Sequence, residues 1–373
     1  MADTGYNKMI KRFEVENFMG FRERLVFDWT ARDYAFNPGL IANGIVQKTL
    51  LYGKNGSGKS SLGLAMFDVI SHLTDKRPMP MHGQIYQYCG NPSVGVSFRY
   101  LLHFGDGEVE YEYVKNGAGG LLRERLVFDG REVVFWNYEN RKQQRFDRGE
   151  FGDLQVELLD NKLSIVKYLH RNIPSNRSPL LGKMVDFFDR MLWFRKVDTG
   201  NEYAGYTNGV SQLAEALHSK GKLEDFRNFL RENGLEYDLE FHPVNGVHDL
   251  FARFGKTSVP FDAVASAGTS ALYLFYFWSL AFGSVSFLFI DEFDAFFHYE
   301  SAEAVVRRLN AQEGMQVALT SHNVHLMQNR LTRPDCCFIL SGGKAVALCD
   351  ATEREIREAH NLEKMYVNGA FRA

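Results

Sequence analysis

A run of eight residues at positions 53–60 (GKNGSGKS) constrains this chain more than any other segment. It fits the pattern GxxxxGK[ST] at every fixed position. In that pattern the glycines let backbone N–H groups converge on phosphate oxygens at the start of a helix, where the helix dipole already favours negative charge. Lys59 is the expected partner of the β- and γ-phosphates, and the hydroxyl of Ser60 is the expected ligand of Mg²⁺.

The segments on either side of this run have the structure that the motif requires. Residues 47–52 (QKTLLY) predict a short buried strand. Apolar residues from Leu62 to Leu73 keep the i, i+3, i+4 spacing of an amphipathic helix. We therefore predict nucleotide binding, rather than a glycine-rich turn that happens to precede a lysine. The candidate nucleotide-binding residues of the loop are Gly53, Asn55, Gly56, Ser57, Gly58, Lys59, Ser60 and Ser61.

Two adjacent carboxylates follow a second apolar strand, predicted at residues 285–290. Ligands of open α/β sheets lie outside the carboxyl ends of the strands, which is where Asp291 and Glu292 come. Asp291 is the candidate Mg²⁺ ligand, acting through water. Glu292 is the candidate general base that accepts the proton of the attacking water. The plain alternative is a pair of acidic residues that caps a buried strand before a turn.

A third apolar strand, at residues 317–320, ends in a histidine. His322 at that tip is a candidate for contact with the γ-phosphate of a nucleotide on the neighbouring loop. A lone histidine is more often structural, so this role depends on the other motifs.

A cluster of small residues at positions 265–269 (ASAGT) precedes an apolar helix predicted at residues 270–280. Small residues with Ser and Gly at a helix N-terminus can form a second anion site. The candidates are Ser266, Gly268 and Thr269. An ordinary N-cap by Ser266 or Thr269 is the alternative on local grounds.

The remaining patterns alternate between strands and helices. A hairpin is expected around residues 17–21, an antiparallel meander over residues 94–135, and helices over residues 150–235. A second β stretch at residues 237–254 is followed by helices and strands that alternate to the end of the chain. A last helix is expected to include residues 353–358 (EREIRE). Together these patterns predict an α/β core with an inserted antiparallel β and helical subdomain.

Composition excludes several classes of protein. Lys and Arg number 43 against 46 Asp and Glu, a net charge of −3, which argues against a general nucleic-acid coat or a polybasic membrane binder. The four cysteines show neither zinc-type spacing nor a disulfide framework, so we expect reduced thiols in a cytoplasmic protein. Residues 271–290 have the length and apolarity of a transmembrane helix. However, Gly283 and Ser284 interrupt them, and a buried helix followed by a buried strand fits better than a membrane span.

The order of these motifs resembles an ABC-type P-loop NTPase head of the SMC-like and overcoming-lysogenisation-defect-like group. GKNGSGKS is similar to its Walker A motif, SAGT to its signature, FLFIDEFD to its Walker B motif and TSH to its switch histidine. The spacing of residues 10–21 resembles the opening strand of these proteins. The ending from Asn361 to Phe371 resembles small ATPases of prokaryotic abortive-infection systems.

The sequence also departs from this group. Its signature lacks the LSGGQ form, which favours the SMC-like side over transporter subunits. No convincing Q-loop is present, since Gln84 and Gln87 are weak candidates. Residues 60–266 contain no heptads, so no long coiled coil is expected. Only about fifty residues follow His322, so any nuclease module is expected to act in trans.

The resemblance implies three parts: an N-terminal ATPase lobe (1–135), an inserted mostly helical subdomain (136–255) and a C-terminal ATPase lobe (256–373). It implies ATP and Mg²⁺, slow turnover, and a homodimer or higher oligomer with ATP sandwiched between two heads. Asn17 or Phe21 is then a candidate for contact with the base. The implied function is a switch that regulates a separately encoded nuclease or toxin in antiphage defence. The alternative is a DNA-repair-like ATPase that binds nucleic acid directly, and we expect no membrane partner.

Overall fold

The structure is a computed structural model of the 373-residue chain. It describes residues 8–76, 87, 91, 93–156, 160–195, 203–205, 213–295 and 297–372.

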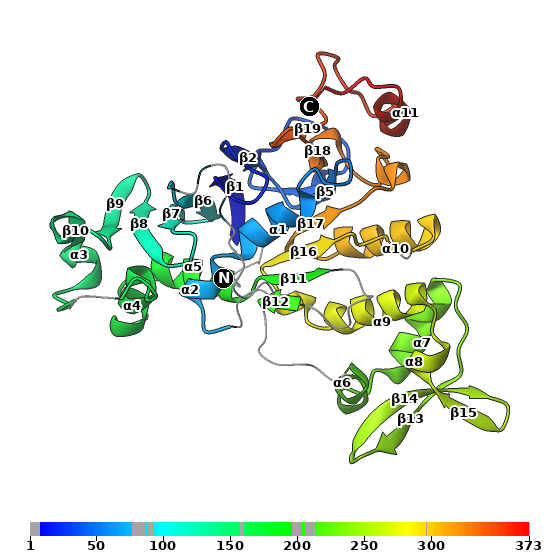
Figure 1. The fold of residues 1–373 in the computed structure, drawn as a ribbon. Helices are drawn as coiled ribbons and strands as arrows, with labels where there is room; N and C mark the ends of the chain where they lie inside the picture. The colour runs from blue at the N-terminus through cyan, green and yellow to red at the C-terminus, as the bar shows by residue number, and fades with distance from the viewer. Residues whose placement is uncertain are drawn as a thin grey trace.

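A mostly parallel sheet of seven strands forms the centre of the molecule (Figure 1). Its five inner strands pair in parallel, and an antiparallel strand lies at each edge. Short, mostly apolar runs form these inner strands because parallel strands are buried on both faces. In order across the sheet, the strands are β12 (Tyr203–Gly205), β11 (Leu192–Arg195), β16 (Phe287–Asp291), β17 (Gln316–Thr320), β5 (Lys48–Tyr52), β18 (Cys337–Ser341) and β19 (Lys344–Ala347).

A second seven-stranded sheet is antiparallel and contains the predicted meander. Residues along β6 alternate between buried and half-buried, as expected for a sheet with one face against a core and one face toward water. The outer face has cross-strand ion pairs such as Arg99 to Glu110 at 2.8 Å. In order, the strands are β10 (Gln144–Phe146), β9 (Arg131–Asn137), β8 (Leu121–Phe128), β7 (Gly107–Lys115), β6 (Val96–Phe104), β1 (Lys8–Glu16) and β2 (Leu25–Asp28).

The described helices and smaller sheets surround these two sheets. The small strands are β3 (Ile41–Ala42) paired with β4 (Ile45–Val46), and a three-stranded sheet of β13 (Leu239–Val244), β14 (Val247–Phe254) and β15 (Thr257–Pro260). The α-helices are α1 (Lys59–Phe67), α2 (Ile70–Leu73), α3 (Arg148–Phe151), α4 (Ile165–Asn172), α5 (Pro179–Asp189), α6 (Leu213–Ser219), α7 (Leu223–Glu232), α8 (Phe261–Val264), α9 (Ala267–Ser279), α10 (Tyr299–Asn310) and α11 (Leu362–Val367). Among the residues described, no helix is both long and apolar enough to cross a bilayer.

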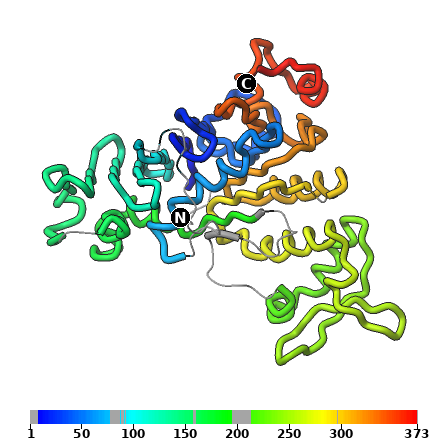
Figure 2. The backbone as a smooth tube through the Cα atoms, in the orientation of Figure 1, coloured from blue at the N-terminus to red at the C-terminus, as the bar shows by residue number. Residues whose placement is uncertain are grey.

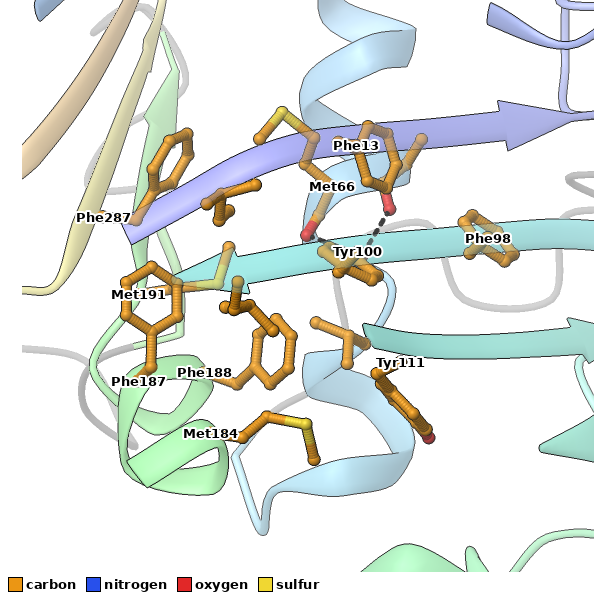
Figure 3. Close-up of a cluster of buried hydrophobic side chains, with 14 of the residues drawn as sticks. Phe13, Met66, Phe98, Tyr100, Tyr111, Met184, Phe187, Phe188, Met191 and Phe287 are labelled. Atoms are coloured by element: carbon orange, nitrogen blue, oxygen red, sulfur yellow. Dashed lines mark hydrogen bonds between the residues drawn. The ribbon is translucent and has the colours of Figure 1, made fainter. Parts of the chain in front are cut away.

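The central sheet separates two hydrophobic cores. Along β16, Phe287 and Phe289 point into one core, and Leu288 and Ile290 point into the other. Figure 3 shows the first core, where Phe187 and Phe188 of α5 meet rings of β6 and β7. The hydroxyl of Tyr100 in this core donates to the backbone carbonyl of Met66 at 3.1 Å, so the antiparallel sheet is bonded to α1.

Segments that are distant in the sequence lie side by side in this fold. β5, near the N-terminus, pairs with β17 and β18 from the C-terminal quarter of the chain, so blue and orange segments adjoin in Figure 2. The predicted mixed α/β class is confirmed. Both the antiparallel meander and the mainly helical stretch come between β5 and β16 along the chain.

Three local predictions were wrong. Residues 62–73 form two helices rather than one, and α1 is buried almost all round rather than amphipathic, because it lies between the two sheets. Leu192–Arg195 was expected within a helix but is strand β11, paired with β16 in the central sheet. Residues 353–358 are not helical; the last helix is α11, which Asn361 caps by accepting from the N–H of Lys364.

Candidate functional site

The phosphate loop connects β5 to α1, as the motif requires. Two of its glycines have no room for a side chain. A Cβ on Gly53 would lie 2.5 Å from Ser57 Oγ and 2.7 Å from the Leu340 carbonyl. At Gly58 the backbone has φ +102°, and a Cβ would lie 2.8 Å from the ring of Phe21. Both positions therefore require glycine for the loop to keep this shape.

The ammonium of Lys59 is turned onto the loop itself. Its Nζ donates to the carbonyls of Gly53 at 2.8 Å and Lys54 at 3.3 Å, and the residue is only 6% exposed. Burial lowers the pKa of Lys59, while the nearby carboxylates of Asp291, Glu292 and Asp294 act in the opposite direction. The lysine is thus held at the mouth of the loop and next to negative charge.

One threonine contacts both residues of the predicted carboxylate pair. Thr320 Oγ1 donates to Asp291 Oδ1 at 2.7 Å and accepts from the backbone N–H of Glu292, also at 2.7 Å. Asp291 is fully buried, whereas Glu292 is half-buried. Glu292 has φ +51°, a conformation that non-glycine residues seldom adopt and that is over-represented at functional sites.

The order of strands brings the motifs together. β5, β17 and β16 are neighbours in the sheet and all run in the same direction. Their carboxyl ends lead into the phosphate loop, the segment with His322, and the carboxylate pair, respectively. Walker A, Walker B and the switch strand therefore meet at one edge of the sheet, as in other open α/β sheets that bind ligands there.

A further carboxylate at this edge was not predicted. Asp294 Oδ2 accepts from Ser321 Oγ at 2.6 Å, and burial raises the pKa of Asp294. His322 next to it is exposed, and its positive form would lower the pKa of the same carboxyl. The only signal in the sequence was the spacing of acidic residues in DEFD, which does not by itself separate a site residue from a turn residue.

The signature segment lies apart from this edge. Ser266 is exposed and caps α9, since its Oγ accepts from the N–H of Thr269 at 3.1 Å. Thr269 is buried, and its hydroxyl lies 2.9 Å from that of Ser266. In Figure 1 the start of α9 lies next to α8 and α7. Within the described part of the chain, no hydrogen bond joins Ser266, Gly268 or Thr269 to the phosphate loop of the same subunit. Ser266 does form the N-cap of α9, and its role as an anion site stays a prediction.

The side chains considered for contact with the base are occupied within the core. The amide of Asn17 donates to the Val94 carbonyl at 2.6 Å, and the ring of Phe21 is buried beside Gly58. Of the two weak Q-loop candidates, Gln87 is buried and donates to the same Val94 carbonyl, and Gln84 lies outside the described residues.

The residues at this edge fit a nucleotide with Mg²⁺. The tight shape of the loop depends on Gly53 and Gly58, and among the described residues the buried hydroxyl oxygen of Ser57 has no hydrogen-bond partner. Ser60 lies in the first turn of α1 and is half-buried, and Asp291 lies at the end of β16. A hydroxyl and a carboxylate are ligands that Mg²⁺ prefers.

Comparison with known families identifies the chain. The family model described as "AAA domain, putative AbiEii toxin, Type IV TA system" matches residues 48–328, which is more than half of the sequence. The chain belongs to this family. The match includes the phosphate loop, the signature segment, the carboxylate pair and His322, but neither residues 10–21 nor the ending from Asn361 to Phe371. It confirms the resemblance to P-loop ATPases of abortive-infection systems. Members of P-loop families generally use ATP with Mg²⁺.

Solved structures similar to this chain include heads of SMC proteins. An SMC head bound to the C-terminal winged-helix domain of ScpA has 14% identity and a TM-score of 0.45, covering 91% of this chain and 97% of its own. The SMC head domain from Thermotoga maritima has 14% identity and a TM-score of 0.42, with coverages of 90% and 97%. An SMC head with an extended coiled coil, bound to the C-terminal domain of ScpA derived from Pyrococcus furiosus, has 14% identity and a TM-score of 0.45, with coverages of 91% and 95%. No curated protein gives a significant match.

Proposed function

We propose that this protein is a Mg²⁺-dependent ATPase that acts as a slow molecular switch. It binds ATP in the phosphate loop, closes into a homodimer or higher oligomer around the nucleotide, and opens after hydrolysis. The observation that carries this proposal is the hydroxyl of Thr320, which bonds Asp291 and the backbone of Glu292 on strands next to the phosphate loop.

Each residue at this edge has a role that its position supports. Ser60 and Asp291 would hold Mg²⁺, whose charge offsets that of the phosphates. Glu292 orients and deprotonates water. Lys59 exchanges its two loop carbonyls for phosphate oxygens. Exposed His322 contacts the γ-phosphate, or senses its loss.

The second subunit would complete the site. Ser266 is exposed at the start of a 13-residue helix, where its hydroxyl caps the N–H of Thr269 and could exchange that contact for a partner's phosphate. Ser266 and Gly268 of one subunit would face the γ-phosphate held by the other, while buried Thr269 would hold Ser266 in place. ATP would then stabilise the closed pair, because its γ-phosphate would contact both subunits, and hydrolysis would remove that difference in binding free energy.

The closed and open states would control a separately encoded effector, a nuclease or toxin, in prokaryotic antiphage defence. The family match supports this proposal, because the family description names a toxin of a toxin–antitoxin system. The alternative, direct binding of nucleic acid, depended on basic stretches such as residues 141–148. Arg145 and Arg148 in that stretch pair with Glu132 at 2.7 Å and Asp153 at 3.3 Å, which offsets their charge.

The test is mass photometry of the Glu292→Gln variant with and without Mg-ATP, repeated with the product of the neighbouring gene. We expect ATP to double the mass of this variant at least, because binding persists while hydrolysis stops. The Lys59→Ala variant is the control and should show no nucleotide-dependent change.

Two results would contradict the proposal. Wild-type rates of ATP hydrolysis by the Glu292→Gln variant would remove the role given to Glu292. An unchanged mass with ATP, together with salt-dependent retention of DNA that ATP strengthens, would favour the alternative function.

A further inference from the structure

Three side chains that can bind metal converge on the surface of the small β subdomain, outside the nucleotide site. Glu215 and His218 belong to α6, and His248 belongs to β14. Their ligand atoms all lie within 4.8 Å of one another. Glu215 and His218 are three residues apart, so both project from the same face of the helix.

The three side chains hold α6 against β14. Glu215 Oε2 accepts from the backbone N–H of His248 at 2.6 Å and lies 3.2 Å from Nδ1 of the same residue. The imidazoles of His218 and His248 stack with ring centroids 3.5 Å apart and planes 17° apart. All three residues are accessible to solvent, since His218 is exposed and the other two side chains are more than one third exposed.

The residue types suit a divalent metal ion, because a neutral imidazole has one ring nitrogen with a lone pair for coordination and a carboxylate supplies oxygen. That lone pair lies in the plane of the ring, so one of the two stacked rings turns when both histidines coordinate the same ion. Two imidazoles and one carboxylate are a ligand set of zinc and of other divalent transition metals. With bonds of about 2.0–2.1 Å, two ligands of a tetrahedral ion lie about 3.3 Å apart, close to the separation of Glu215 Oε2 and His248 Nδ1.

A nearby histidine, His242, lies on the opposite face of the same sheet. Across the hairpin, His248 pairs with Pro243, whereas His242 pairs with Asp249, so the two histidines project from opposite faces. His242 lies 2.8 Å from Glu240 and next to the ring of Phe251. It therefore provides a matched control: a histidine beside a glutamate in the same sheet, without a second imidazole.

We propose that Glu215, His218 and His248 bind one divalent transition-metal ion, with Zn²⁺ as the best match, and that water completes the coordination. This site differs in chemistry from the oxygen-rich edge proposed for Mg²⁺. In Figure 1, α6 and β14 lie below the central sheet, apart from α1.

The ion would fix the position of α6. A helix of seven residues is not stable by itself, so α6 depends on its contacts with β14 and α9. β14 also packs against α8, which leads directly to Ser266. If the proposed function is right, the metal would therefore stiffen the part of the subunit that presents the signature residues.

The experiment is calorimetric titration of the chelator-treated full chain with Zn²⁺, in buffer that contains excess Mg²⁺. The wild type, His242→Ala and Lys59→Ala chains are each expected to bind one Zn²⁺. His218→Ala and His248→Ala are expected to bind it at least about 100-fold more weakly, since even supporting partners of metal ligands contribute 10–100-fold. Co²⁺ should give the visible absorption of a tetrahedral nitrogen and oxygen site in the wild type and in the His242→Ala chain, but not in the His218→Ala chain.

Two outcomes would overturn the proposal: equal Zn²⁺ affinity in the wild type and the His218→Ala chain, or an equal loss in the His242→Ala chain. Either would leave a stacked histidine pair without a metal role. Circular dichroism in the presence of chelator tests whether each variant folds. If His248→Ala does not fold, Glu215→Gln and His218→Ala still test the site, because both side chains are accessible to solvent. Failure of the proposed function would instead appear as absent ATP binding with Zn²⁺ binding intact.

Discussion

At the scale of single residues, the candidate site depends on contacts between residues that are far apart in the sequence. Gly58 is necessary because the ring of Phe21 occupies the space of its missing side chain, and Phe21 lies 37 positions earlier in the sequence. Thr320 matters because its one hydroxyl serves two residues of the neighbouring strand. These two residues lead to the first two predictions.

Replacing Gly58 by Ala should distort the phosphate loop. The new Cβ meets an aromatic ring at 2.8 Å in addition to the backbone strain at φ +102°. The matched control is Gly56→Ala, where φ is +76° but nothing lies within 4 Å, so only the strain of about 1–3 kcal/mol remains. We expect Gly58→Ala to lower the free energy of unfolding by about 1–3 kcal/mol more than the control, as overpacking usually does. Urea unfolding of both variants measures the difference, and equal losses would show that Phe21 moves freely.

Replacing Thr320 by Val should remove both hydrogen bonds without changing the volume much. A buried Asp291 oxygen and the Glu292 N–H would each lose a partner, at a cost of about 1–3 kcal/mol each. Because Glu292 would lose its anchor, ATP hydrolysis should fall more than ATP affinity does. Thr320→Ser keeps the hydroxyl and should keep the rate within a few fold. Equal rates in the Val and Ser variants would show that the hydroxyl does not position Glu292.

At the scale of elements, a buried glutamine connects the two large sheets. Gln316 of β17 accepts from the N–H of Ile10 at 2.9 Å and donates to the carbonyls of Ile10 and Val46 at 2.9 and 3.1 Å. Ile10 lies at an irregularity in the pairing of β1 with β6, where the ladder leaves its backbone groups to other partners.

Replacing Gln316 by Leu should therefore destabilise the protein by about 2–4 kcal/mol, because it buries backbone groups of Ile10 without partners. Gln143→Met, in an exposed turn, is the control and should change stability by less than about 0.5 kcal/mol. Thermal or urea unfolding gives both values. A loss below 1 kcal/mol for Gln316→Leu would mean that water or a backbone shift satisfies Ile10.

The strands and helices also show which parts of the fold the sequence pattern predicts. Period-two alternation predicted the meander, and the continuous apolar runs predicted β5, β16, β17 and β18. β11 was missed because LWFR follows the amphipathic helix α5 without a clear break, and only its pairing with β16 makes it a strand. β11 lies in the middle of the chain but belongs to the central sheet. The division into domains at residues 135 and 255 stays a prediction.

At the scale of the whole molecule, the central sheet is shared by both hydrophobic cores. Neighbouring residues of β16 point to opposite sides: Phe289 packs against Gly63 of α1, and Ile290 lies in the core with α9 and α10. A loss of packing on either side therefore weakens the same strand.

We expect Phe289→Ala and Ile290→Ala each to lower the free energy of unfolding by about 2–5 kcal/mol. Each variant should still unfold in a single calorimetric transition at a lower temperature, because neither core keeps its sheet when the other melts. Leu163→Ala, at an exposed position, is the control and should leave the transition in place. Two separated transitions in either core variant would show that the two halves unfold independently.

The sequence by itself determined the phosphate loop, the carboxylate pair, the family and most strands, because these depend on short spacings that local physics dictates. Only the tertiary structure decided that β11 joins the central sheet, that Thr320 bonds Asp291 and Glu292, and that Glu215 and His218 meet His248 some thirty residues away. Each of these is a pairing of segments distant in the chain. Such pairings depend on which apolar faces are buried together, and a local pattern does not contain that information.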